Sequence, residues 1–200
     1  LKEQMLKEIR NLHKTIGFSA IYVTHDQNEA LYLSDKIAVL NKGKVEQFAA
    51  PKEILRSPAT PFVADFFGYT NRFENAWLLE SGKVRVGELE IPAGHMGENC
   101  KAGDSGILLM RSNAVQILDD SKERVADDRE KRIEAYVLDS RYMGGQTELK
   151  VRLVRAAENE ITVVVPRMLT QLPEEGTVVE VSFDADSISF FQAAKGDLPV

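Results

Sequence analysis

The sequence predicts an α/β segment followed by an all-β region made of small barrel-like units. In the first third of the chain, apolar residues recur at helical spacing and then in a Val- and Ile-rich run that leads into a helix-capping sequence. Further on, short stretches of alternating apolar and polar residues are separated by turn residues. We therefore expect two domains, residues 1–70 and residues 71–200, with the boundary between Gly68 and Asn71.

Composition narrows the class of protein. The 200 residues are 44% hydrophobic and 28% charged, which is typical of a globular protein. The formal net charge of −6 argues against a general nucleic-acid binder, which is usually basic. Cys100 is the single cysteine, so an internal disulfide is excluded and a reducing compartment is expected. No apolar run reaches the length of a membrane-spanning helix, so we expect membrane association only through partner proteins.

The first predicted element is an amphipathic helix that ends at Gly17. Its apolar stripe, which we expect to pack against a sheet, consists of Leu1, Met5, Ile9, Leu12 and Ile16. Residues Ser19 to Thr24 follow and are rich in strand-forming side chains, so we expect a buried strand there.

The strand is predicted to end at His25, next to the start of a second helix that runs to Ser34. Asp26 is the predicted N-cap, and Glu29 is placed three residues later to complete a capping box. This arrangement would put His25 at the carboxyl end of a strand, where α/β sheets bind ligands, beside a helix terminus that favours anions. The plainest alternative is that His25 belongs to a capped turn with no further role.

A hairpin and two short helices complete the predicted first domain. The hairpin strands are separated by a turn containing Gly43, and prolines at 58 and 61 separate the helices. The predicted strands are Ile37–Leu40 and Val45–Phe48, and the predicted helices are Lys52–Arg56 and Phe62–Phe67.

These segments together resemble the ATP-binding subunits of ABC transporters over residues 1–70. The residues that carry the resemblance are Tyr22 to Ala30, Leu33 to Leu40, Gly43-Lys44, Pro51 to Leu55 and Pro58. The resemblance implies that His25 is the switch histidine of the H-loop, which contacts the γ-phosphate of ATP. An imidazole suits this role, because it can donate a hydrogen bond to a phosphate oxygen and orient the attacking water.

Other motifs of that family do not occur in this sequence. A phosphate-binding loop reads Gly-x-x-x-x-Gly-Lys-Ser/Thr, and neither Gly43-Lys44 nor Gly82-Lys83 fits it. No apolar strand ending in Asp-Glu precedes His25. The resemblance places these elements upstream, so we expect this chain to be the C-terminal part of a longer subunit and to be unable to hydrolyse ATP alone.

For the longer subunit, the resemblance implies ATP and Mg²⁺ as cofactors and a second copy of the subunit as a dimer partner. It also implies membrane permease subunits as partners, which would hold the protein on the cytoplasmic face of the membrane. The transported substrate is not encoded in these residues. No nucleic-acid partner is implied.

The second half carries ten predicted strands, which is more than one five-stranded barrel uses and suits two interleaved OB-like units. The strands are expected at Ala76–Leu79, Lys83–Val86, Leu89–Ile91, Ser105–Arg111, Ala114–Ile117, Arg132–Arg141, Thr147–Val154, Glu160–Val165, Val178–Phe183 and Ile188–Phe191. The charged stretch Asp119 to Lys131 is expected to be a solvated loop.

This half resembles the TOBE region that follows the ATPase core in some ABC importers. The resemblance rests on Tyr142 to Thr147, which is similar to the family's Tyr-Leu-Gly turn, and on Ile188 to Phe191. Where the family has Arg-Pro-Glu, this chain has Arg111-Ser112-Asn113 and keeps only the arginine. The regulatory contacts of that motif therefore do not carry over as a whole.

Three other features of the sequence allow other interpretations. Met143 to Gln146 is similar to the ABC signature Leu-Ser-Gly-Gly-Gln, but it leads into an alternating strand, so we interpret it as a glycine turn. A small oxyanion could bind Arg111 or Arg141. A basic and aromatic patch could instead bind nucleic acid on an OB-like surface, and it comprises Arg141, Tyr142, Lys150, Arg152 and Arg155.

Three functional hypotheses follow. The leading one is a portion of an ABC importer ATPase with a regulatory and dimerisation domain. The alternative is a non-enzymatic ligand-sensing or oligomerisation module of OB type. The third, a metal-dependent His-Asp phosphohydrolase, needs more ligands than the sequence offers, because neither His13 nor His95 lies at metal-ligand spacing from His25.

Overall fold

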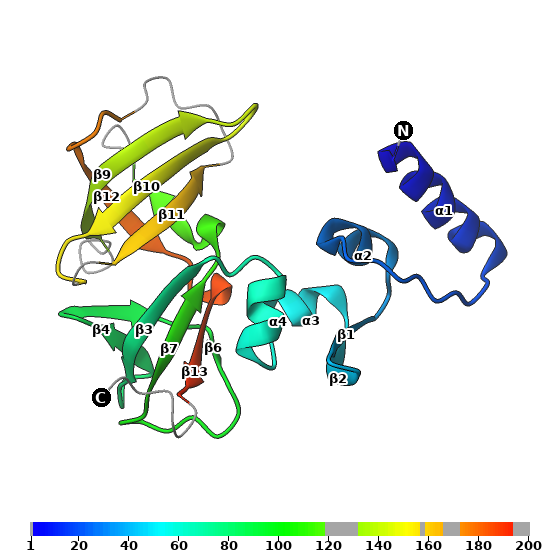
Figure 1. Cartoon of the computed structure of the whole chain (residues 1–200), viewed down its shortest axis with the longest axis horizontal. Coiled ribbons are helices and arrows are strands. Elements are labelled where there is room, and N and C mark those ends of the chain that lie inside the picture. The colour runs from blue at the N-terminus through cyan, green and yellow to red at the C-terminus, as the bar shows by residue number, and fades with distance from the viewer. Residues whose placement is uncertain (1, 119–131, 157–158, 166–172, 194–200) are drawn as a thin grey trace. The chain divides into compact units, whose positions relative to one another are not determined.

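The structure is a computed structural model that describes residues 2–118, 132–156, 159–165 and 173–193. The chain divides into two compact units, Leu1–Phe67 and Gly68–Val200. Figure 1 shows the elements of both units along the chain. The predicted loop at residues 119–131 lies outside the described residues.

The first unit contains four helices and one hairpin among its described residues. In chain order these are α1 (Lys2–Ile16), α2 (Gln27–Leu33), β1 (Ile37–Asn41), β2 (Lys44–Ala49), α3 (Pro51–Arg56) and α4 (Pro61–Phe66).

Helix α1 confirms the first predicted helix and its C-terminal stop. Gly17 adopts a left-handed φ of +73°, and its N–H donates to the carbonyl of His13 at 2.8 Å. The packing predicted for the apolar stripe is not found among the described residues, because Met5, Leu12 and Ile16 remain 47%, 52% and 64% exposed. Only Leu6 of this helix is buried.

The predicted strand at residues 19–24 is wrong. The structure shows a stretch without regular structure, in which Ile21 and Val23 are 95% and 90% exposed. Among the described residues, no other strand pairs with this stretch. A preference of Ile and Val for strands is realised only against a neighbouring strand, which explains the difference. His25 therefore does not lie at the edge of a sheet in this structure.

The hairpin confirms the local turn signals. Lys42 and Gly43 form a two-residue turn with φ values of +49° and +79°, the combination that matches the twist of paired strands. One face of the hairpin and the two following helices share a core, made of Ile37, Val39, Ala49, Ile54, Val63 and Phe67.

A side chain that the sequence did not single out fixes the link between α3 and α4. The amide nitrogen of Gln47 donates to the carbonyl of Ser57 at 2.9 Å, and the N–H of Ala59 donates to the amide oxygen of Gln47 at 2.9 Å. Both helices begin with proline, at Pro51 and Pro61. At this first position the missing N–H removes no hydrogen bond within the helix.

The second unit is built from two sheets, which confirms the predicted all-β, barrel-like region. The six-stranded sheet has the order β5-β4-β3-β7-β13-β6, and the five-stranded sheet has the order β11-β10-β9-β12-β8. The first comprises β3 (Asn71–Leu78), β4 (Lys83–Val86), β5 (Leu89–Pro92), β6 (His95–Met96), β7 (Ser105–Met110) and β13 (Ile188–Gln192). The second comprises β8 (Val115–Ile117), β9 (Ile133–Tyr142), β10 (Thr147–Leu153), β11 (Glu160–Val165) and β12 (Val178–Phe183).

The five-stranded sheet is inserted in sequence between strands of the six-stranded sheet. Strands β8 to β12 are consecutive in sequence and form the second sheet, whereas β13, which follows them, lies between β7 and β6 of the first sheet. The pairing of β13 with β6 is parallel, and the other pairings of both sheets are antiparallel. The six-stranded sheet is therefore complete only with a strand that follows the whole second sheet in sequence.

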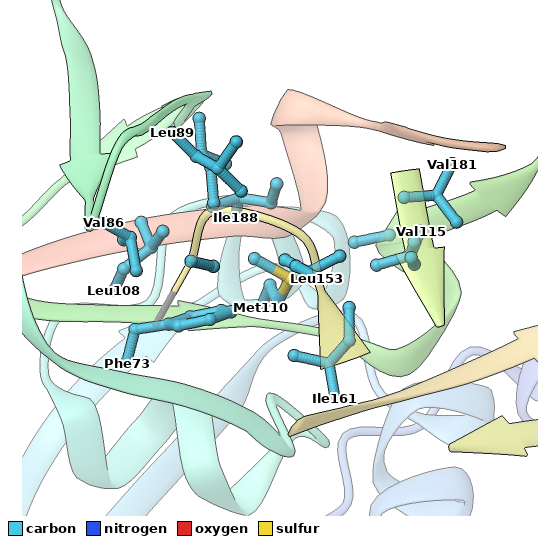
Figure 2. Packing of buried hydrophobic residues seen from close by; sticks show 14 of the residues in the cluster. Phe73, Val86, Leu89, Leu108, Met110, Val115, Leu153, Ile161, Val181 and Ile188 are labelled. Atoms are coloured by element: carbon cyan, nitrogen blue, oxygen red, sulfur yellow. The ribbon is translucent and has the colours of Figure 1, made fainter. Parts of the chain in front are cut away.

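Both sheets contribute to one hydrophobic core. Figure 2 shows Met110 and Phe73 from the six-stranded sheet close to Leu153 and Ile161 from the five-stranded sheet. These side chains are at most 2% exposed, and the removal of such apolar side chains from water stabilises this unit.

Asn71 joins the two sheets through its side chain. The residue is 3% exposed, and its amide nitrogen donates to the carbonyl of Thr162 at 2.8 Å while its amide oxygen accepts from the N–H of Thr162 at 2.7 Å. Thr162 lies in β11, the edge strand of the second sheet. The amide group of Asn71 thus imitates the backbone of a further strand at that edge.

We predict that Asn71→Ala lowers the free energy of unfolding of the second unit by about 1–3 kcal/mol, because a buried pair of backbone groups loses its partner. Urea unfolding followed by the fluorescence of Trp77, the single tryptophan, measures this. Asn113→Ala, at an exposed position of the same unit, is the control and should change the value by less than about 0.5 kcal/mol. Equal effects of the two substitutions would contradict the role of Asn71.

Candidate functional site

The candidate site is the turn that presents His25. His25 is exposed and lies at a bend between residues 18–24, which we call the extended stretch, and α2. The predicted N-cap is confirmed, since the carboxylate of Asp26 accepts hydrogen bonds from the N–H groups of Asn28 at 2.8 Å and Glu29 at 3.1 Å. The first turn of α2 is therefore fixed directly after the histidine.

The predicted capping box is only half present. In a capping box, the N–H of Asp26 would donate to the carboxylate of Glu29. It donates instead to the hydroxyl oxygen of Thr24 at 2.9 Å. The hydroxyl of Thr24 in turn donates to the carboxylate of Glu29. A residue just before the histidine thus takes the place that the capping box assigns to Glu29.

Glu29 has three partners around this turn. It is 9% exposed, and its carboxylate accepts hydrogen bonds from Thr24, from the hydroxyl of Tyr22 at 3.1 Å and from the ammonium of Lys2 at 2.8 Å. Lys2 also pairs with Asp26 at 2.7 Å. The first helix, the extended stretch and α2 therefore meet at one carboxylate.

The charges of this cluster stabilise one another. The hydrogen bond from Lys2 lowers the pKa of Asp26, and the backbone N–H of Glu29 adds to the effect. The pKa of Glu29 is lowered first by Lys2 and then by the hydroxyl of Thr24. In the opposite sense, the carboxylate of Glu29 raises the pKa of the Tyr22 hydroxyl. Both carboxylates are consequently ionised at neutral pH.

The described residues do not form a metal site. No group of three or more His, Cys, Asp or Glu side chains in that part of the chain is placed to hold a metal ion. The chemistry available at the turn is that of an exposed imidazole, which donates to an anionic oxygen or accepts a proton from water.

The stretch that is similar to an ABC signature is a turn between strands. Gly144 and Gly145 adopt φ values of +62° and +129° between β9 and β10. The N–H of Met143 donates to the carbonyl of Gln146 at 2.8 Å and closes the turn. The glycine-turn interpretation is confirmed, because no helix begins here.

The basic residues considered for nucleic-acid binding are largely paired with acids. Arg141 pairs with Asp139 at 2.5 Å, and Arg152 pairs with Glu160 at 3.0 Å. Lys150 also pairs with Glu160. Tyr142 ends β9 and is 51% exposed, and Arg155 lies in a turn after β10. These carboxylates reduce the positive charge on which the nucleic-acid alternative depended.

Arg111, the other candidate for an oxyanion, precedes a short 3-10 helix of residues Ser112–Ala114. Its backbone N–H donates to the carbonyl of Ser187 at 3.1 Å. Arg111 directly follows β7 in the six-stranded sheet, whereas Arg141 lies in β9 of the five-stranded sheet.

Comparison with known proteins identifies relatives of both halves. The family described as the TOBE domain matches residues 108–191. The spermidine/putrescine import ATP-binding protein PotA of Trichormus variabilis is 52% identical over 90 residues, which is 45% of this chain and 22% of that protein. The PotA protein of Vibrio cholerae is 35% identical over 156 residues, 76% of this chain and 40% of that protein.

Another relative is the sulfate/thiosulfate import ATP-binding protein CysA of Acinetobacter baylyi, which is 44% identical over 91 residues, 46% of this chain and 25% of that protein. The chain thus spans less than half the length of these curated relatives. Among solved structures, the molybdate-bound form of the cytoplasmic molybdate-binding protein ModG superimposes with a TM-score of 0.43 at 14% identity, covering 60% of this chain and 93% of that one.

We predict that the first turn of α2 stays ordered at neutral pH and loses order as the pH falls below the ordinary pKa values of 3.8 for Asp and 4.5 for Glu. Both native pKa values are lowered, so the stabilisation is complete above the ordinary values and is lost through the lower native ones. Amide chemical shifts of Asn28 and Glu29, recorded against pH, measure the midpoint. Lys2→Met should raise that midpoint, and an unchanged midpoint would contradict the role of Lys2.

The TOBE match agrees with the fold of the second unit, and the relatives' names agree with the sequence motifs of the first unit. The second unit supplies the two-sheet domain in which the match lies, and the first unit carries the residues that resemble an ATP-binding subunit. Residues 108–191 are thus part of a TOBE domain, and the chain is homologous to ATP-binding subunits of ABC importers.

Proposed function

We propose that this chain is the C-terminal part of the ATP-hydrolysing subunit of an ABC importer. In this proposal residues 1–70 supply the switch histidine, and residues 71–200 form the regulatory and dimerisation domain. The observation that carries the proposal is the 52% identity over 90 residues to an import ATP-binding protein. The family motif from Tyr22 to Ala30 and the TOBE match over residues 108–191 support it.

His25 is the residue proposed to act on ATP. It is exposed, and the capped turn of α2 fixes the backbone next to it. Phosphoryl transfer depends on positioning and on stabilising negative charge that is spread over the γ-phosphate. An imidazole N–H presented to a γ-phosphate oxygen serves both needs, and its other nitrogen can hold the attacking water.

The residues of this chain do not by themselves fit ATP and Mg²⁺. The sequence has no phosphate-binding loop, and the described residues form no metal cluster. In this proposal, the other phosphate contacts and the ligands of Mg²⁺ come from the remainder of the longer subunit. His25 then completes a site that other residues build.

The proposed partners are membrane permease subunits and a second copy of the subunit, at the cytoplasmic face of the membrane. In the portions of the chain that the structure describes, no helix is long and apolar enough to cross a membrane. One group of relatives is named for spermidine and putrescine import and another for sulfate and thiosulfate import. Because both groups match, we assign no transported substrate.

We predict that His25→Ala in the longer subunit lowers ATP hydrolysis about a hundredfold or more, the range expected when a group that stabilises transition-state charge is removed. Phosphate release measures the effect, and His13→Ala is the control, since it removes another histidine of the same unit. Preserved hydrolysis and transport in the His25 variant would favour a non-enzymatic ligand-sensing or oligomerisation module instead.

We also predict that the purified 200-residue chain releases phosphate from ATP no faster than buffer with Mg²⁺ alone, because it lacks a phosphate-binding loop. The same phosphate assay at high protein concentration checks this. Turnover of about one per second, ordinary for an enzyme, would refute the dependence on the rest of the subunit.

A further inference from the structure

The backbone on each side of His25 is held by side chains. The residue before it, Thr24, and the residue after it, Asp26, are joined by the hydrogen bond from the Asp26 N–H to the Thr24 hydroxyl oxygen at 2.9 Å. This bond links the two neighbours of His25 and does not involve its imidazole, which is exposed. The orientation of the histidine therefore depends on where the hydroxyl of Thr24 is held.

Glu29 holds that hydroxyl. Its carboxylate accepts from Thr24 and from Tyr22, two residues that approach His25 in the extended stretch. Within residues 18–24, no backbone hydrogen bond joins the stretch to a neighbouring strand in the part of the chain that is described. The hydrogen bonds from Tyr22 and Thr24 to the carboxylate of Glu29 therefore connect this stretch with α2.

Glu29 is more deeply buried than a residue in the first turn of a helix needs to be. Among the described residues it is the only charged residue that is buried, and burying a carboxylate is unfavourable unless it has hydrogen-bonding partners. Glu53 offers a comparison within the same unit, since it occupies the same third position of α3 that Glu29 occupies in α2. Glu53 is exposed. The position in the helix alone does not explain the partners of Glu29.

We propose that Glu29 is the positioning residue for His25. Through the hydroxyl of Thr24 it fixes the peptide group between His25 and Asp26, and through Tyr22 it fixes the stretch that leads to the histidine. Glu29 does not touch ATP in this proposal. The functional part rests on the proposed role of His25, whereas the positioning itself can be measured on this chain without nucleotide.

The first test measures the backbone motion of His25 by nuclear magnetic resonance in the 200-residue chain. We expect the order parameter of the His25 amide to fall from about 0.85 to below about 0.6 in Glu29→Ala, and exchange of the Asp26 amide to accelerate about tenfold. Glu53→Gln should change neither value, and Glu29→Gln should fall between. A His25 amide that stays rigid in Glu29→Ala would overturn the proposal.

Thr24 variants keep this test decisive where Glu29→Ala disturbs the fold. Thr24→Val has nearly the same shape and lacks only the hydroxyl, so it should loosen His25 as Glu29→Ala does. Thr24→Ser keeps the hydroxyl and should restore the rigid amide. Unchanged resonances of the β1–β2 hairpin show that the unit remains folded. If Thr24→Val and Thr24→Ser behave alike, the path through Thr24 is refuted.

A double-mutant cycle in the longer subunit tests the functional part. Glu29→Ala should lower kcat for ATP hydrolysis about tenfold when His25 is present and less than about twofold in the His25→Ala background, because residues that act as a unit are not additive. Equal losses in both backgrounds would show a general structural role and overturn the positioning proposal. If His25→Ala has no effect, the proposed function fails, while the motion measurements still decide whether Glu29 orders the turn.

Discussion

The carboxylate of Glu29 is the contact on which the arrangement around His25 depends. Segments of the first unit that share no sheet meet there, since Lys2, Tyr22 and Thr24 all donate to it. The charge–charge pairing with Lys2 offsets the unfavourable burial of the carboxylate, and the two hydroxyls satisfy its remaining acceptor sites. An exposed histidine thereby gains a fixed backbone although the stretch before it has no partner strand among the described residues.

The second unit is stabilised in a different way, by a core shared between two sheets. Its strands alternate buried and exposed side chains, as in Thr147–Leu153, and the buried sides of both sheets form one cluster. Strand β13 joins β7 and β6 of the six-stranded sheet only after the chain has passed through the whole five-stranded sheet.

Local signals predicted most of the fold. The hairpin around Gly43, the N-cap at Asp26 and the proline-led helices follow from residues close in sequence, and nearly all of the predicted strands of the second unit appear. Strand β6 was missed because it has only two residues, between Gly94 and Gly97, and forms only against β13. The return of β13 to the six-stranded sheet has no local signal in the sequence.

The errors in the first unit have a non-local cause as well. The stretch at residues 19–24 has strand-forming side chains but no partner strand among the described residues, so the predicted strand and sheet edge are not found. The sequence indicated that Asp26 and Glu29 begin a helix, but not that Thr24 would replace Glu29 as acceptor of the Asp26 N–H. That exchange depends on how the extended stretch folds back on α2. The role of His25 in ATP chemistry stays a prediction.

The imidazole of His25 offers the most direct measurement. In the longer subunit with 15N-labelled histidine, a non-hydrolysable ATP analogue with Mg²⁺ should shift the ring resonances of His25, and ADP with Mg²⁺ should not, since only the former carries a γ-phosphate. The rings of His13 and His95 serve as internal references and should respond to neither nucleotide. Identical His25 spectra with both nucleotides would contradict a contact between this histidine and the γ-phosphate.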